Sequence, residues 1–265
     1  MLAQRTLKNP IKAFGIGLHS GKPIQLSLKP APTDTGIIFR RVDLDPSEEI
    51  LARAENVGET SLSTTLCKGE VKISTVEHLL SEIRNCTVCA PFLEHGPRPV
   101  LNASRKSKIL VIGQAPGTRV HKTGIPWNDP SGKTLRQWMN ISDADFYDPQ
   151  QVGIVPMGFC YPGKGRSGDL PPRKECAPLW HKKLLDQMPD LKLTLLIGQY
   201  AQAYYLAGEN QKTLTDTVRS HKKYAPHYFP LPHPSPRNRI WLKRNPWFEA
   251  EVIPLLQQKI AEALI

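Results

Sequence analysis

Hydrophobic and polar positions alternate in the first third of the chain. Ile24–Leu28 (IQLSL) and Gly36–Phe39 (GIIF) have the pattern of half-buried strands. Ser74-Thr75-Val76-Glu77 has Ser or Thr as capping residue and a glutamate close behind, which is typical of a helix start. Residues 1–82 are therefore predicted to form a small α+β segment.

After residue 83 the pattern changes to short, wholly apolar runs separated by helical stretches. The runs, predicted to be buried strands, are Lys108–Gln114, Val152–Gly158, Leu193–Gln199 and Tyr228–His233. Helices are predicted near Gly132–Ile141, Arg173–Gln187 and Tyr200–Ala207, with a last one across Asn245–Leu264. This alternation favours a parallel sheet covered on both faces. Residues 83–265 are predicted to form a three-layer α/β/α sandwich around a central four-stranded parallel sheet.

The composition excludes several classes of protein. With 40% hydrophobic and 22% charged residues among 265, the chain is not wholly disordered. Its apolar runs are too short to span a bilayer, and no basic-then-apolar signal segment opens it. A cytoplasmic protein with no membrane partner is expected, and we expect it to be a monomer.

The net charge of +11 is unevenly distributed. Residues 1–82 hold ten Lys+Arg and ten Asp+Glu, so residues 83–265 hold 25 basic and 14 acidic residues. A basic domain beside a neutral segment suggests a polyanion as partner. The alternative is a basic surface that only keeps the protein soluble, and salt dependence of binding would separate the two.

The first 82 residues carry a dense family pattern. It consists of Gln4–Lys8, Gly15–Gly21, Leu28–Pro32, Gly36–Arg41 and Ser74–Leu80. These stretches resemble the start of UDP-3-O-acyl-N-acetylglucosamine deacetylase, a zinc hydrolase of lipid A synthesis. The resemblance implies that Glu77 is a general base and His78 a first zinc ligand. A catalytic zinc normally needs three protein ligands, and nothing after residue 83 resembles the rest of that family, so we expect a truncated piece without deacetylase activity.

Three loops of the basic domain carry a second family pattern. Gly113–Gly117 (GQAPG) follows the first predicted strand, Thr123–Trp127 (TGIPW) comes next with Gly132 close behind, and Pro232–Asn238 (PHPSPRN) follows the fourth strand. Together they resemble the uracil-DNA glycosylase superfamily over about residues 83–265. The resemblance implies hydrolysis of the N-glycosidic bond of uracil in DNA, the first step of base excision repair.

The resemblance also assigns roles to residues in these loops. A base must leave the duplex to be excised. Trp127 would stack on it, unless it is an ordinary core aromatic, and His233 would stabilise the negative charge on the leaving base, unless it is structural. The other residues implied to bind substrate are Gly113, Ala115, Pro116, Gly117 and Ser235, and Arg237 and Asn238 would meet the minor groove or the phosphates.

The residue that activates water is less clearly marked. The best-known branch of the superfamily has Asp where Ala115 stands, and the iron–sulfur branch has Glu where Gln114 stands. Glutamine can orient water but cannot act as a carboxylate base. Asp129 resembles the aspartate of another branch, so we rank it above Gln114. The asparagine that usually reads uracil is replaced by Pro156-Met157-Gly158, so the substrate is uracil or another deaminated base, and a DNA-binding module without catalysis is an alternative.

Four cysteines suggest a metal centre. Cys86 and Cys89 form a CxxC, and Cys160 and Cys176 are fifteen residues apart. Thiolates at such positions bind a [4Fe–4S] cluster or a tetrahedral zinc. The pattern resembles that of the iron–sulfur uracil-DNA glycosylases, which implies a structural cluster; zinc and no metal are the alternatives.

The segment between the last two of these cysteines is basic. Lys164 and Arg166 lie in it, and we expect them to contact DNA. Cys67 lies outside the pattern and is predicted to be a buried thiol of the first segment.

Overall fold

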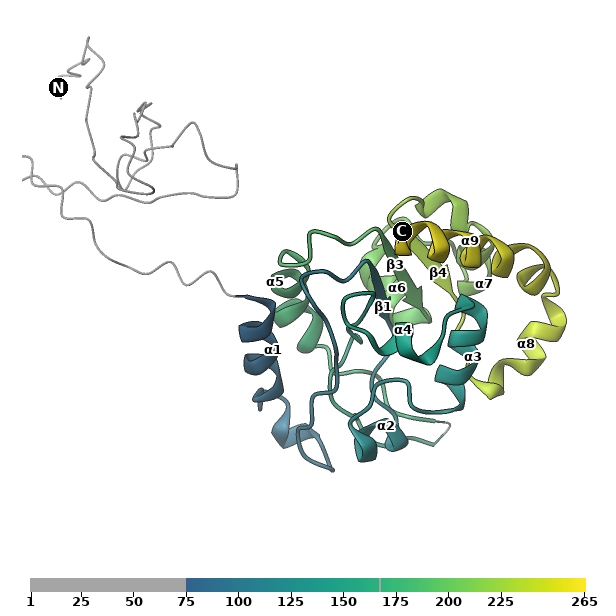
Figure 1. The fold of residues 1–265 in the computed structure, drawn as a ribbon. Coiled ribbons are helices and arrows are strands. Elements are labelled where there is room, and N and C mark those ends of the chain that lie inside the picture. Colours follow the sequence, from purple (N-terminus) through teal and green to yellow (C-terminus); the bar gives the residue numbers. More distant parts are fainter. Residues whose placement is uncertain (1–74, 167) are drawn as a thin grey trace, which may run out of the picture. The chain divides into compact units, whose positions relative to one another are not determined.

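The computed structural model describes residues 75–166 and 168–265 (Figure 1). The predicted strands before residue 75, Cys67 and most of the deacetylase-like pattern lie outside the described residues. Ile73–Ile265 forms one compact unit.

The four predicted strands are present and form one sheet. They are β1 (Ile109–Ile112), β2 (Val152–Ile154), β3 (Leu193–Ile197) and β4 (Tyr228–Leu231). Their order is β2-β1-β3-β4, and every neighbouring pair is parallel. Ile109 pairs with both Val152 and Leu193, so β1 and β3 occupy the centre of the sheet. The prediction of a four-stranded parallel sheet is confirmed.

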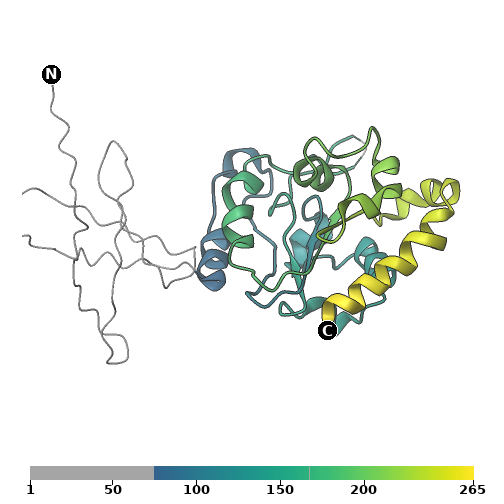
Figure 2. The same cartoon turned by 90° about the horizontal axis from the view of Figure 1, so that it is seen from above.

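Helices cover both faces of the sheet, as Figures 1 and 2 show. Those packed on one face are α1 (Val76–Arg84), α5 (Lys182–Leu185) and α6 (Gln199–Tyr205). Those packed on the other are α3 (Pro130–Met139), α4 (Asp143–Tyr147), α7 (Leu214–Arg219) and α9 (Ile253–Leu264). Two short helices, α2 (Thr118–Thr123) and α8 (Arg239–Arg244), follow the functional loops.

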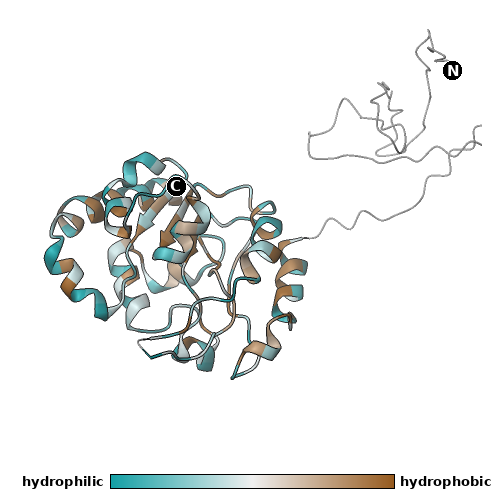
Figure 3. Cartoon of the chain, turned by 180° about the vertical axis from the view of Figure 1, so that it is seen from behind, coloured by the Kyte–Doolittle hydropathy of each residue, from teal (hydrophilic) through white to brown (hydrophobic). Residues whose placement is uncertain are grey.

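Alternation along the strands divides the core into two layers. Leu110 and Ile112 of β1 pack with the α1 side, whereas Ile109 and Val111 pack with the α9 side. Successive side chains of a strand point to opposite faces, and all four are fully buried. Figure 3 shows apolar residues gathered in the strands and polar ones on the outer helices. No helix among the described residues is long and apolar enough to cross a membrane.

Two predicted helices start later than expected. The one predicted from Arg173 begins with a π-helical turn at Ala177–His181 before α5. The last one begins with a π-helical turn at Phe248–Val252 before α9. Both stretches have a proline near the start, which lacks the N–H needed inside a helix and so fixes where the first turn can lie.

Helix α1 links the deacetylase-like pattern to the glycosylase-like core. Thr75 caps it, accepting a hydrogen bond from the His78 N–H at 3.2 Å, which confirms the predicted start. Its buried residues, Val76, Leu79, Leu80 and Ile83, pack in the same core layer as α5 and α6. The boundary predicted at residue 82 stays a prediction, and α1 packs on the domain that follows it.

Candidate active site

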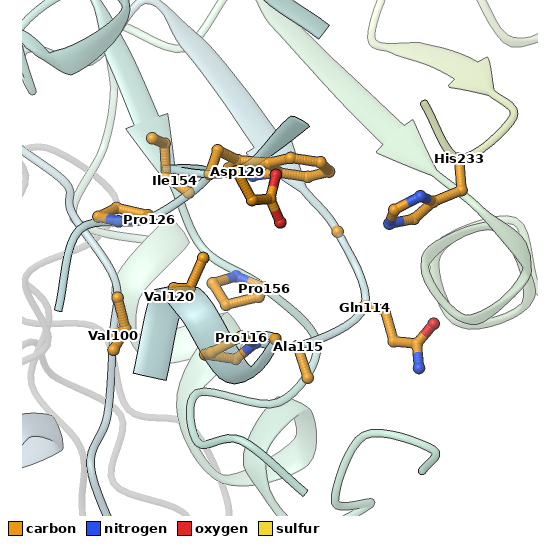
Figure 4. A pocket seen from close by; sticks show the side chains of 13 residues that line it. Val100, Gln114, Ala115, Pro116, Val120, Pro126, Asp129, Ile154, Pro156 and His233 are labelled. Carbon is orange, nitrogen blue, oxygen red and sulfur yellow. The ribbon is translucent and has the colours of Figure 1, made fainter. Parts of the chain in front are cut away.

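A pocket opens at the carboxyl ends of β1, β2 and β4 (Figure 4). Parallel α/β sheets place their ligand sites at this edge. The pocket brings together the loops that the sequence analysis selected. It is lined by Gly113, Gln114, Ala115, Pro116 and Gly117, by Trp127, Asp129 and His233, and by Val100, Val120, Pro126, Ile154 and Pro156.

Trp127 is seated between two glycines. A Cβ atom added to Gly113 would lie 2.8 Å from the Trp127 ring, and one added to Gly132 would lie 1.7 Å from the Trp127 carbonyl oxygen. Trp127 has a positive φ of 55°, and Arg136 Nη1 donates to its carbonyl at 3.3 Å. Its ring is half-buried, packs against the core and also lines the pocket. The two roles considered for Trp127 are therefore compatible.

Asp129 is both a helix cap and a pocket residue. Its Oδ1 accepts a hydrogen bond from the Gly132 N–H at 2.8 Å, which makes it the N-cap of α3. Figure 4 shows its carboxylate pointing into the pocket. One oxygen is thus fixed by the helix while the group faces the space that a ligand would fill.

His233 closes the pocket opposite this carboxylate. Its ring centroid is 5.7 Å from that of Trp127, with an angle of 30° between the planes. Burial lowers the pKa of His233, and the nearby Asp129 charge opposes this only in part. A neutral imidazole has one N–H to donate. The geometry gives the pocket an aromatic face, a neutral donor and a carboxylate.

Two family models match the sequence, and one of them covers the loops that line the pocket. The model of the uracil DNA glycosylase superfamily matches residues 101–257. The chain belongs to the uracil DNA glycosylase superfamily. A second family model, UDP-3-O-acyl N-acetylglycosamine deacetylase (LpxC), matches residues 4–106. Both predicted resemblances are confirmed.

Curated relatives match through the deacetylase-like part. The UDP-3-O-acyl-N-acetylglucosamine deacetylase of Cellvibrio japonicus is 47% identical over 151 residues, which are 56% of this chain and 47% of the relative. That of Hahella chejuensis is 54% identical over 162 residues, which are 60% of this chain and 50% of the relative. The chain spans about half the length of the curated relatives it matches.

Two solved structures are similar to this superfamily member. One is the solution structure of a protein from Methanosarcina acetivorans assigned to the uracil DNA glycosylases, with a TM-score of 0.37 and 14% identity, covering 61% of this chain and 98% of that one. The other is the crystal structure of Pedobacter heparinus SMUG2, with a TM-score of 0.29 and 15% identity, covering 60% of this chain and 73% of that one.

Gln114 of this glycosylase-superfamily chain is engaged in a hydrogen bond. Its Nε2 donates to the Leu170 carbonyl at 3.2 Å. The main chain of the same loop accepts hydrogen bonds from the loop after β2, with Met157 N to Gly113 O at 2.9 Å and Gly158 N to Gln114 O at 3.0 Å. The amide of Gln114 therefore holds a neighbouring loop while the side chain lines the pocket.

The loop Pro232–Asn238, here called the HPSP loop, is fixed by its own polar side chains. Asn238 Nδ2 donates to the His233 carbonyl at 2.6 Å, and Ser235 Oγ accepts from the Arg237 N–H at 3.2 Å. Asn238 and Ser235 therefore stabilise the turn that presents His233. Their predicted contacts with DNA and substrate stay predictions.

A buried histidine behind the pocket and its half-buried tyrosine partner were missed by the sequence analysis. His181 is 2% exposed; its Nε2 lies 3.1 Å from the Pro156 carbonyl and its Nδ1 lies 2.6 Å from the Tyr205 hydroxyl. Since a carbonyl only accepts, Nε2 donates to Pro156 and the Tyr205 hydroxyl donates to Nδ1. This pair fixes the wall where the superfamily usually has its uracil-reading asparagine.

The four cysteines of the predicted metal centre lie near one another as free thiols. Burial, with smaller contributions from Cys89 and Cys86, raises the pKa of Cys160 to about 11 and that of Cys176 to about 12. Cys89 and Cys160 share a small apolar cluster with Leu93. Among residues 75–166 and 168–265, no three His, Cys, Asp or Glu side chains form a ready-made metal site.

The donor chemistry of these thiols nevertheless fits a metal or a cluster. The buried thiols of Cys89, Cys160 and Cys176 have little stabilisation as anions by themselves, since burial raises their pKa values, and a bound cation would supply it.

The deacetylase-like pair occupies the solvent side of α1. Glu77 and His78 are both exposed, and His78 Nδ1 lies 3.8 Å from Glu82 Oε1. In the part of the chain that the structure describes, no zinc-ligating group assembles around them. That this piece lacks deacetylase activity stays a prediction.

The basic loop between Cys160 and Cys176 approaches the HPSP loop. Lys164 and Arg166 are exposed, and a Cβ added to Gly168 would lie 2.9 Å from Arg237 Nη1. The predicted DNA contacts therefore come from two loops that meet beside the pocket.

Proposed function

We propose that this protein hydrolyses the N-glycosidic bond of uracil in DNA. The observation that carries the proposal is the convergence of Trp127, Asp129 and His233 on one pocket at the sheet edge. An aromatic face, a neutral hydrogen-bond donor and a carboxylate are what base excision needs. Membership of the superfamily supports base excision as the reaction, and the side chains that line the pocket support a flipped base of DNA as the substrate.

The residues divide the reaction between them. The flipped base lies against Trp127 and the apolar wall of Val120, Pro126 and Ile154. As the bond breaks, negative charge develops on the base, and the His233 N–H donates to its carbonyl oxygen. One such donor contributes about 100- to 1,000-fold to a rate in a water-poor site.

Asp129 orients the attacking water in this mechanism. Its Oδ1 is held by the Gly132 N–H, so the carboxylate has a fixed direction and its second oxygen is available to the water. Gln114 is the weaker candidate, because an amide is no base and its NH2 already donates to Leu170.

The pocket wall leaves the base range open to other deaminated bases. Pro156 lines the pocket and its carbonyl faces His181, where an asparagine amide would pair with the polar edge of uracil. We propose uracil as the preferred base. Hypoxanthine- and xanthine-containing oligonucleotides are the comparison substrates.

We propose that Cys86, Cys89, Cys160 and Cys176 hold a [4Fe–4S] cluster, with zinc as the alternative. The group would be structural: it would tie the segment after α1 to both ends of the basic loop. The DNA contacts then include Lys164 and Arg166 of that loop together with Arg237.

The test is alkali-induced strand cleavage of a labelled single-stranded oligonucleotide with one uracil, using anaerobically purified protein. The wild type should remove the uracil and so make the strand cleavable by alkali. His233→Ala should lower the single-turnover rate of excision by about 100-fold or more with little change in DNA affinity. An undiminished rate in His233→Ala refutes the role of His233. Salt-sensitive DNA binding with no cleavage of any substrate would favour a binding module without catalysis.

A further inference from the structure

A carboxylate that no motif marks lies beside a loop that lines the pocket. Asp169 belongs to the basic loop between Cys160 and Cys176, yet a Cβ added to Gly117 would lie 3.3 Å from Asp169 Oδ2. Gly117 lines the pocket. Asp169 is distant in sequence from the loop Gly113–Gly117 that follows β1, but it lies next to that loop in the structure.

Hydrogen bonds hold the loop of Asp169 in this place. Gln114 Nε2 donates to the neighbouring Leu170 carbonyl at 3.2 Å, and Leu170 N donates to Gly163 O at 2.9 Å. Lys164 and Asp169 form an isolated antiparallel bridge. The loop is therefore fixed both internally and against the pocket.

The side chain of Asp169 is oriented by a polar chain from α2. Thr118 Oγ1 donates to the hydroxyl of buried Tyr161 at 3.1 Å, and Tyr161 donates to the Asp169 carboxylate. Arg237 and Lys164 are the cations that act on it, and Asp129 is the nearby anion. Burial raises the pKa of Asp169, and the two cations and Tyr161 oppose that rise.

The position of Asp169 relative to a substrate follows from its closeness to Gly117. A flipped base that fills the space beside Trp127 would leave its deoxyribose outside the pocket, and Asp169 lies beside the loop that lines it. The sugar becomes cation-like as the bond breaks, and a nearby carboxylate favours that charge. Asp169 keeps an exposed side, as a group that meets an incoming strand requires.

We propose that Asp169 is a second catalytic carboxylate of this site, which faces the deoxyribose of the flipped nucleotide and stabilises its positive charge as the base leaves. The inference rests on the proposed glycosylase function. Asp129 holds the water, and Asp169 acts on the sugar.

The test compares Asp169→Asn with Asp186→Asn in single-turnover excision and in DNA binding. Both variants remove one negative charge, and Asp186 is an exposed residue that pairs with Lys182 on α5. Asp169→Asn should lower the excision rate by about 100-fold while DNA affinity is unchanged or rises, because an anion near the phosphates is lost. Asp186→Asn should keep the wild-type rate.

Two results would overturn the assignment. An Asp169→Asn rate equal to that of the wild type excludes a catalytic role. A parallel fall in rate and affinity means that Asp169 only holds the loop, and Tyr161→Phe, which keeps the carboxylate, should then behave identically. If the wild type itself excises no base, the proposed function fails and the role of Asp169 with it, whereas an active wild type confines the failure to Asp169.

Discussion

The seating of Trp127 depends on a glycine that is also part of a helix. Gly132 lies in the first turn of α3, where alanine normally stabilises a helix by about 0.5–1 kcal/mol relative to glycine. Here an added Cβ would lie 1.7 Å from the Trp127 carbonyl oxygen and 2.9 Å from its Cβ. The collision is with main-chain atoms, so no side-chain rotation relieves it.

We therefore expect Gly132→Ala to destabilise the domain by about 3 kcal/mol and to reduce excision, because Trp127 or the start of α3 must move. Urea unfolding followed by tryptophan fluorescence measures the change. Gly96→Ala is the control: Gly96 has φ +72° and nothing within 4 Å of an added Cβ, so it should cost only about 1–2 kcal/mol. A stabilised Gly132→Ala would contradict the geometry.

At the scale of residues, positions that lie inside one motif could be selected from the sequence, and their roles stay predictions. Gly113, Trp127 and His233 were selected together because their loops carry a family pattern, and the pocket unites them. Asp169 and His181 were missed because their relevance comes only from tertiary contacts. The signal available for Asp169 was a carboxylate close behind the basic residues Lys164 and Arg166.

At the scale of elements, strands were easier to predict than helices. The four apolar runs became β1 to β4 because strands buried on both faces are apolar throughout. Short helices such as α2 and α8 have too few turns to show a periodic pattern and depend on tertiary packing.

The loop between Cys160 and Cys176 is the element that a metal centre would order. We expect anaerobically purified protein to contain about four irons per chain with matching sulfide, and Cys160→Ser to lose them. The cysteine-bound loop should then be cleaved faster by protease, and DNA affinity should fall because Lys164 and Arg166 are no longer held in place.

Metal analysis of whole chains measures this directly. Cys67→Ser is the matched control, since Cys67 lies outside the predicted ligand set, and it should keep the full iron content. A colourless protein with one zinc per chain would show that the bound group is zinc and not a cluster. A metal-free protein with ordered loops would exclude both groups.

At the scale of the whole molecule, the pH dependence of stability combines its buried histidines with its excess of basic residues. Burial lowers the pKa of His181 from 6.5 to about 4, against a smaller opposing effect of the Pro156 carbonyl. Between pH 6.5 and about 4, the His181 side chain is therefore protonated in the unfolded chain and neutral in the folded one. Stability from this residue is complete above pH 6.5 and is lost as the pH falls toward 4.

We expect the free energy of unfolding to fall by about 3 kcal/mol from His181 alone as the pH drops from about 6.5 to 4. Burial also lowers the pKa values of His121, His221 and His233, so the wild type should lose more in total. His181→Gln removes one titration and isolates its share as the difference in pH slope between the two proteins.

All five tryptophans lie between Trp127 and Trp247, so their fluorescence reports on the described domain alone. His227→Gln, at an exposed histidine, should keep the wild-type loss between the two pH values. An equal slope in His181→Gln and wild type would mean that His181 takes up its proton without unfolding the domain. Protonation adds a hydrogen at Nδ1, so the Tyr205 hydroxyl would then have to turn from donor to acceptor, while Nε2 keeps its hydrogen bond to the Pro156 carbonyl and the pocket wall stays in place.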